Sequence, residues 1–483
     1  MLFNSLSFAI FLPIVFFLYW FIAKRGVRFQ NIILLISSYF FYACWDWRFL
    51  FLLIASTSLD YYTGLKISDA STKENKKFWL WLSVIVNLGF LGIFKYYNFF
   101  AASFVDALSL VGLKADLGSI NVILPVGISF YTFHGLSYVI DLYKDKIKPE
   151  RDIINYSVFV CFFPLLVAGP IERATHLLPQ IIRKREFNYS QSVDGLKQIL
   201  WGLFKKMVIA DHCATYVNLI FKDASDYTGS TLVLGAVFFS FQIYCDFSGY
   251  SDIALGTARL FGIELLRNFA FPYFSRDIAE FWRRWHISLS SWFRDYLYIP
   301  LGGSRGGKWI SVRNMFIIFL VSGFWHGANW TFIAWGTLHA LYFVPLLLMN
   351  KNRNHIADIV AKGKYFPTFK EFFSMLFTFT LTVFAWIFFR AENMGHAVSY
   401  ITGIFSIDLF RQPYFLGIKE ALITILFIIL MVIIEWVGRE QAYAIKVIAS
   451  RWRKPLQWCF YYAIVMLIFL FGSKSQEFIY FQF

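Results

Sequence analysis

The stretch that decides the fold is RNMFIIFLVSGFWHGANWTFIAWGTLHALYFVPLLLMN, residues 313–350. Between Arg313 and Lys351 it contains no Asp, Glu, Lys or Arg. A continuous helix of this length would be roughly 55 Å long, whereas the hydrocarbon core of a bilayer is about 30 Å thick. We therefore predict two apolar helices, separated by a break near residues 327–329.

His326 stands directly before this break, roughly 20 Å along the helix from Arg313 and hence deep in the membrane. Ionisable groups at such depth usually face a protein interior or a water-filled cavity, and they often mark function. The neighbouring glycines leave space beside the ring. The pattern favours a chamber around His326 that is lined by Trp325, Asn329 and His339. A hydrogen-bonded, purely structural histidine is the alternative.

The composition indicates a membrane protein. Of the 483 residues, 58% are hydrophobic and only 16% are charged, against about 25% charged residues in soluble domains. We predict an all-α polytopic protein with a single membrane domain over residues 1–483. It should contain about 11–13 transmembrane, re-entrant and interfacial helices around a central chamber. The candidate spans are 5–23, 30–47, 49–66, 78–100, 121–142, 153–171, 195–221, 231–247, 313–326, 329–349, 371–390, 418–437 and 456–472.

Charge placement predicts an orientation. Basic clusters at 24–28, 73–77 and 144–151 follow the first, third and fifth predicted spans, and the loop at 101–120 is nearly neutral. The positive-inside rule then places the N-terminus outside and these clusters in the cytoplasm. Topology and lipid headgroups account for most of the net charge of +15. We expect no nucleic-acid partner, because no nucleic-acid-binding motif is present.

The five cysteines are scattered, odd in number and without a C-x-x-C pair. Neither a disulfide framework nor a metal site is predicted. The N-terminal apolar run lacks the basic start and the small-residue cleavage site of a removable signal peptide, so it is interpreted as a retained first span.

Two further segments carry charged residues. Residues 276–298 place aromatic side chains on one face and arginines on the other, which predicts a helix lying in the membrane interface, with His286 on its flank. The glycine-rich loop that follows resembles a phosphate-binding loop only weakly. Further upstream, Asp246 and Asp252 are compatible with an ion or proton site, or with hydrogen bonding and the capping of a helix that begins near Asp252.

Five motifs together resemble the membrane-bound O-acyltransferase family, and the resemblance runs nearly from end to end. It is strongest to the bacterial alginate O-acetyltransferase branch, which includes peptidoglycan O-acetylating relatives and, more distantly, the D-alanyl transferase of teichoic acids. The terminal sequences MLFNSLSF and FIYFQF also resemble that branch. The five motifs are PVGISFYTFHGLSYVIDLY (125–143), FFPLLVAGPIER (162–173), YCDFSGYSDIALG (244–256), FWRRWHISLSSWFRDYLYIPLGG (281–303) and VSGFWHGANWTFIAWGTLHAL (321–341).

The resemblance implies transfer of an acyl group from a cytoplasmic thioester, acetyl-CoA, to a hydroxyl group across the membrane. It also implies a bacterial inner membrane, no bound cofactor, and an exported partner with a serine nucleophile that acetylates a polysaccharide. The family's hallmark histidine falls on His326, and a second family position falls on His286. Imidazole suits general base catalysis at neutral pH, so we expect His326 to activate the acceptor hydroxyl. His286 would orient or polarise a reactant, or relay a proton.

The basic residues near His286 have two interpretations. Arg283, Arg284, Arg305 and Lys308 would attract the anionic donor if they face the cytoplasm. Anionic membrane lipid is the competing ligand.

A transporter or channel with an intramembrane His/Asp site is the alternative function. The lack of matching halves weighs against a transporter built from inverted repeats. An acyltransferase with a lipid or protein acceptor is a third interpretation, against which the bacterial-branch motifs weigh. Among polysaccharides the acceptor stays open between alginate, another exopolysaccharide and peptidoglycan.

Overall fold

A computed structural model describes residues 1–22, 26–114, 116–120, 123–167, 169–356, 358–448, 452–472 and 476–479. Within these ranges the chain forms helices and loops without any β-strand, which confirms the all-α prediction. Seven of the described helices are long and apolar enough to cross a membrane, as a multi-pass protein requires. Lys24, Arg25 and the last four residues of the FIYFQF motif lie outside the described residues.

The chain divides into two compact units. Unit 1 comprises Met1–Ser192 and Thr257–Leu266, and unit 2 comprises Val193–Gly256 and Arg267–Phe483. Each unit is described by itself below. The single membrane domain over residues 1–483 stays a prediction.

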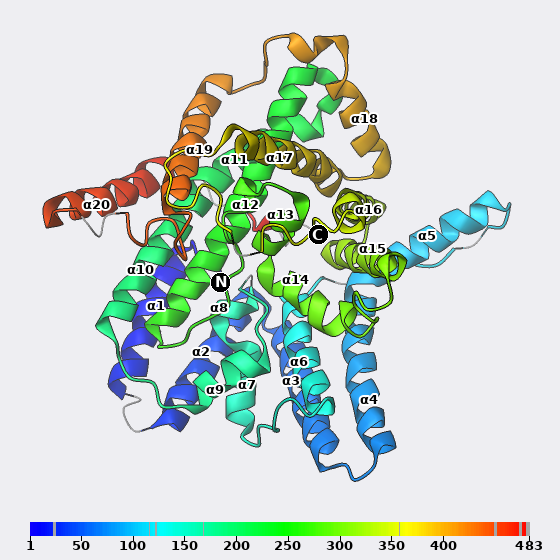
Figure 1. Ribbon diagram of the computed structural model, residues 1–483. Coiled ribbons are helices and arrows are strands. Elements are labelled where there is room, and N and C mark those ends of the chain that lie inside the picture. Colours follow the sequence, from blue (N-terminus) through cyan, green and yellow to red (C-terminus); the bar gives the residue numbers. More distant parts are fainter. Residues whose placement is uncertain are drawn as a thin grey trace. The chain divides into compact units, whose positions relative to one another are not determined.

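Unit 1 contains the N-terminal helices (Figure 1). They are α1 (Leu6–Phe17), η1 (Leu18–Ile22), α2 (Val27–Asp46), α3 (Arg48–Asp69), α4 (Lys73–Leu91), η3 (Gly92–Tyr96), α5 (Tyr97–Leu110), α6 (Ile128–Tyr143), α7 (Ile153–Cys161), α8 (Phe163–Leu166) and α9 (Ala174–Ile182).

A buried polar network joins α3, α4 and α6. Asp60 on α3 accepts hydrogen bonds from Ser83 Oγ (2.6 Å) and Asn87 Nδ2 (2.7 Å) on α4. A Cβ atom on Gly135 of α6 would clash with the Asp60 carboxylate, so only glycine allows this approach. Helices in lipid associate through such close packing and polar contacts rather than through the hydrophobic effect.

Two sequence interpretations of unit 1 need correction. Within the described part of the predicted span at 121–142, the helix begins at Ile128, after the left-handed Gly127 at φ 75°, and continues through Gly135. The predicted span at 153–171 stops at Cys161, and the short α8 is the one helix that follows among the described residues of this span. In both segments proline and glycine shorten the helix relative to the predicted span.

Two of the three basic clusters that the sequence assigned to one side of the membrane, 73–77 and 144–151, meet at one end of unit 1. Lys76 pairs with Asp145 at 2.8 Å, and Arg151 pairs with Asp69 at 2.9 Å. These ion pairs bring the loops after the third and fifth predicted spans together. The orientation of that end toward the cytoplasm stays a prediction.

Unit 2 contains most of the remaining helices; α10 and α12 each also extend into unit 1. They are α10 (Tyr189–Leu203), η4 (Phe204–Ala210), α11 (Asp211–Lys222), η5 (Ala224–Asp226), α12 (Gly229–Leu260), η6 (Pro272–Phe274), α13 (Ile278–Arg284), α14 (Ile287–Phe293), η7 (Arg294–Tyr298), α15 (Lys308–His326), α16 (Trp330–Leu348), α17 (Phe369–Arg390), α18 (Met394–Ile404), η8 (Ile407–Phe410), α19 (Ile418–Gly438) and α20 (Lys454–Phe471).

The stretch that decides the fold forms a helical hairpin (Figure 1). Helix α15 ends at His326, and α16 starts at Trp330 after Asn329, whose side chain accepts from the Thr331 backbone N–H. The predicted break is confirmed. Cβ atoms on Gly323 or Gly336 would clash with backbone carbonyl oxygens of the opposite helix, so glycine permits the close approach.

Asp246 and Asp252 lie inside α12, not at its start. The capping interpretation is therefore wrong. Both carboxylates form ion pairs with lysines of η4: Asp246 with Lys206 at 2.8 Å, and Asp252 with Lys205 at 2.6 Å. Because charges within a low-dielectric interior need partners, these pairs tie η4 to α12.

The predicted amphipathic helix over 276–298 is broken into α13, α14 and η7. Its aromatic face is not turned toward lipid, because Phe281 and Trp285 are each only 1% exposed and Trp292 is 7% exposed. The single interfacial helix was the wrong interpretation for this segment. Helical periodicity cannot distinguish an apolar face that meets lipid from one that meets other helices.

Candidate active site

His326 is presented by the C-terminal end of α15. Its side chain is buried at 3% exposure, and the helix stops there because Gly327 is extended at φ −160°. Trp325, Trp335 and Phe389 surround the ring, with ring centroids at 4.8, 5.2 and 5.4 Å from that of His326. The aromatic neighbours leave an apolar environment in which a polar imidazole is unusual.

His286 reaches the same region from the junction between α13 and α14. It is fully buried and has left-handed backbone angles, φ 43° and ψ 54°. Non-glycine residues rarely adopt this conformation, and where they do the surrounding structure holds them there. Here Asn268 O accepts from Ile287 N at 2.9 Å, and Arg284 O accepts from Ala270 N at 2.9 Å. The segment 268–270 thus fixes the turn that carries His286.

The two histidines lie together in unit 2. Their ring centroids are 6.4 Å apart and their planes are inclined by 56°. Trp325 touches both rings. Hydrogen bonds span about 3 Å, so both imidazoles can reach one small reacting group between them. The sequence predicted both residues for catalysis, and the fold brings them together.

The predicted chamber-lining residues occupy different positions. Trp325 packs beside both histidine rings. Asn329 is used as a helix cap, since its Oδ1 accepts from Thr331 N (3.1 Å) and its Nδ2 donates to Glu392 O (2.7 Å). His339 accepts from Trp282 Nε1 at 3.2 Å and lies 5.0 Å from the Trp335 ring, on the side of that tryptophan next to α13. Their lining role stays a prediction.

The predicted donor-binding residues form two groups. Arg283 and Arg284 are half-buried and bond inside unit 2, Arg283 to Asn352 O (2.9 Å) and Arg284 to Glu280 Oε1 (2.7 Å). Arg305 and Lys308 are exposed in and after the glycine-rich loop, and Lys308 Nζ donates to Leu348 O at 3.0 Å. The arginine pair is committed to structural bonds, whereas the loop residues face outward. Donor binding by all four stays a prediction.

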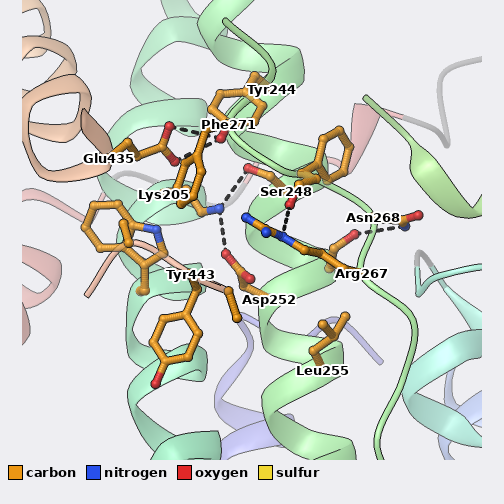
Figure 2. Close-up of a pocket in the computed structure, with 15 residues that line it drawn as sticks. Lys205, Tyr244, Ser248, Asp252, Leu255, Arg267, Asn268, Phe271, Glu435 and Tyr443 are labelled. Carbon is orange, nitrogen blue, oxygen red and sulfur yellow. Dashed lines mark hydrogen bonds and ion pairs between the residues drawn. The ribbon is translucent and has the colours of Figure 1, made fainter. Parts of the chain in front are cut away.

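A polar cavity that the sequence did not predict is lined by Asn268, the residue that contacts His286 (Figure 2). Its volume of about 20 Å³ suffices for one water molecule. Lys205, Asp252, Arg267, Asn268 and Glu435 are among its lining residues. One available signal was the lysine pair within the predicted apolar run 195–221, because charges in a membrane helix need partners on neighbouring elements.

His134 is buried and packs inside unit 1. Its Nε2 accepts from Glu172 N at 3.0 Å, and its Nδ1 lies 3.5 Å from Val160 O. Both ring nitrogens therefore face backbone groups. In the described part of the chain, no three or more His, Cys, Asp or Glu side chains are grouped as metal ligands. The absence of a metal from the reaction stays a prediction.

The described helices and the buried histidine pair define a multi-pass membrane protein with a candidate catalytic site. Comparison with known proteins agrees with that class. The family model for MBOAT, membrane-bound O-acyltransferase family, matches residues 143–384.

Three relatives illustrate the similarity to known acyltransferases. The chain is 41% identical over 409 residues to the probable alginate O-acetylase AlgI of Pseudomonas syringae pv. tomato, covering 84% of this chain and 75% of that protein. It is 34% identical over 529 aligned positions to the peptidoglycan O-acetyltransferase of Helicobacter pylori, covering 100% and 98%. It is 31% identical over 262 residues to the teichoic acid D-alanyltransferase of Streptococcus thermophilus, covering 51% and 63%. The chain belongs to the membrane-bound O-acyltransferase family, and it is an acyltransferase.

Proposed function

We propose that this protein transfers an acetyl group from cytoplasmic acetyl-CoA across the bacterial inner membrane, for O-acetylation of an extracytoplasmic polysaccharide. The names of the relatives support an acetyl group and a polysaccharide or peptidoglycan acceptor. The observation that carries the proposal is the meeting of His286 and His326, from separate elements, in one buried site.

The chemistry of the transfer follows from the residue types. An alcohol becomes a sufficient nucleophile when a base removes its proton during attack. His326 takes this proton as the hydroxyl oxygen forms a bond to the thioester carbonyl carbon. The carbon–sulfur bond then breaks, and the coenzyme A thiolate leaves with the proton from the imidazolium. His286 holds the hydroxyl group in place for this step.

Positive charges on the protein attract the anionic donor. Coenzyme A carries several phosphate charges, and Arg305 and Lys308 are exposed cations on a glycine-rich loop. Arg283 and Arg284 contribute to the positive field from their half-buried positions. On the other side of the membrane, an exported partner with a serine nucleophile receives the acetyl group and passes it to the polysaccharide. The partner is inferred from the family resemblance.

The test uses the full chain in nanodiscs with acetyl-labelled coenzyme A and a bacterial cell-envelope fraction as the source of acceptor and partner. Free thiol release and transfer of the label to polysaccharide are measured. The wild type should turn over, and His326→Ala should lower kcat by about 100-fold or more, since general base catalysis contributes about 10²–10⁴-fold. His396→Ala serves as the matched control, because His396 is partly buried in unit 2 near the start of α18.

Two outcomes would overturn the proposal. A folded His326→Ala variant with wild-type kcat would return His326 to a packing role. Movement of an ion or solute across liposomes without any acyl donor, together with no thiol release by the wild type, would favour the transporter alternative.

A further inference from the structure

Asn268 contacts His286 through both its backbone and its side chain. Its carbonyl oxygen accepts from Ile287 N (2.9 Å), and its Oδ1 lies 3.3 Å from His286 Nδ1. Asn268 is itself 1% exposed. Asn268 lies in an irregular segment after α12, 18 residues before His286. It falls outside the five sequence motifs.

The partners of the Asn268 amide determine which way it points. Ser288 Oγ donates to Oδ1 at 2.6 Å, and Nδ2 donates to Ser251 Oγ of α12 at 3.2 Å. The amide oxygen, which carries no hydrogen, therefore faces His286. The Nδ1 nitrogen of His286 must donate to it, and a neutral imidazole with Nδ1–H has a lone pair on Nε2.

The Nε2 atom of His286 is buried and has no hydrogen-bond partner among the residues that the structure describes. Buried polar atoms are usually satisfied, and an unsatisfied one in a site is a position for a ligand group. The ring that carries this atom lies 6.4 Å from the His326 ring between centroids. His286 Nε2 is thus available to accept a hydrogen bond close to His326, the proposed base.

We propose that Asn268 is a positioning residue that holds His286 as the Nδ1–H tautomer, so that Nε2 accepts a hydrogen bond from the acceptor hydroxyl. This inference rests on the proposed function. It narrows the role of His286, because a neutral ring with a lone pair at Nε2 cannot donate to the thioester carbonyl. His286 binds the hydroxyl group, and His326 removes its proton.

Charged and titratable groups surround this arrangement on two sides. His326 of α15 faces the His286 ring. Behind Asn268, the cavity is lined by Lys205 and Asp252, which pair at 2.6 Å, and by Arg267 and Glu435. Lys205 and Asp252 neutralise each other. Asn268, which is uncharged, lines this cavity and also contacts His286. A carboxylate in its place would stabilise the imidazolium form of His286.

The test compares variants of the full chain in the nanodisc assay. Asn268→Leu should lower kcat by about 10- to 100-fold with little change in the KM for acetyl-CoA, because loss of an orienting group leaves the wrong tautomer populated. Asn268→Asp keeps the acceptor oxygen and should restore part of kcat. Its carboxylate should also move the acidic limb of the kcat–pH profile to higher pH, a shift that a purely structural role would not produce.

A matched serine pair keeps the test valid if Asn268→Leu fails to fold. Ser251→Ala removes the group that anchors Nδ2 and should lower kcat a few-fold. Ser240→Ala removes a similarly buried hydroxyl on the same helix and should leave kcat unchanged, because within the described ranges this hydroxyl bonds only to Ala236 O. Equal kcat values for the two variants would overturn the inference.

A failure of the inference about Asn268 can be distinguished from a failure of the proposed function. If His286→Ala is inactive but Asn268→Leu has wild-type kcat and pH profile, the inference is wrong and the proposed function stands. If His286→Ala itself keeps wild-type kcat, the proposed role of His286 is wrong.

Discussion

Glu172 shows how a single residue organises unit 1. Its carboxylate is fully buried and accepts from Leu266 N at 2.6 Å and from His176 Nδ1 at 2.8 Å. Its backbone N–H meanwhile donates to His134 Nε2. The structure shows that the glutamate is an interior tie, because a buried carboxylate needs several donors.

The interaction between His176 and Glu172 should make the stability of the fold depend on pH. The hydrogen bond to Glu172 raises the pKa of His176 above its usual value. The stabilisation is therefore fully present below about pH 6.5, the unfolded pKa, and is lost as the pH rises through the raised folded pKa. We expect the apparent Tm of the wild type to exceed that of His176→Gln by more at pH 6 than at pH 9.

Thermal unfolding in detergent across this pH range measures the effect. The magnitude should be small, because the His176 side chain is 37% exposed and solvent screens the pair. Glu172→Gln should remove the same pH-dependent step. A Tm difference that stays constant from pH 6 to pH 9 would contradict the assignment.

At the scale of elements, the α15–α16 hairpin depends on two glycines at the helix contact. Gly323 lies one turn before His326, so any separation of the helices moves the candidate base. Overpacking at such a contact costs about 1–3 kcal/mol. We expect Gly323→Ala to lower the apparent Tm and to lower kcat at least tenfold, measured on the same nanodisc sample.

Gly89→Ala is the control for this substitution. Gly89 is also inside a helix, α4, but nothing lies within 4 Å of an added Cβ atom there. Alanine at that position should leave kcat unchanged and should raise stability slightly, since glycine in a helix is less favourable by about 0.5–1 kcal/mol. Equal effects at Gly323 and Gly89 would show that the hairpin contact does not position His326.

The break between α13 and α14 at His286 could not be predicted from the local sequence pattern. The spacing of aromatic and arginine residues over 276–298 was interpreted as one interfacial helix. The chain instead breaks at His286, because backbone bonds from segment 268–270 hold that residue in a left-handed conformation. Nothing in the local sequence around His286 specifies this pairing.

At the scale of the whole molecule, charge placement predicts the orientation in the membrane. The basic clusters 73–77 and 144–151 lie at the same end of unit 1, as their cross-links Lys76–Asp145 and Arg151–Asp69 show. The positive-inside rule assigns this end to the cytoplasm. The loop after α5, at the other end of the α4–α5 run, should face outward.

Cysteine labelling tests this orientation. In a background with the exposed Cys44 and Cys459 replaced by serine, Lys73→Cys should react with an impermeant maleimide only after the cells are permeabilised. Lys114→Cys should react in intact spheroplasts. The reverse pattern would invert the predicted orientation, and labelling of both from one side would show that the α4–α5 run does not cross the membrane.

The sequence by itself determined the class of protein, the positions of most long helices and the break after His326, because hydropathy, chain length and glycine placement are local properties. Its motifs also indicated the family and marked His286 and His326. Only the tertiary structure decided that these two rings meet, that Asn268 orients one of them, and that Lys205 and Lys206 neutralise the aspartates of α12. Such pairings join residues far apart in the chain, and they depend on which helix faces pack together, a property that no local pattern encodes.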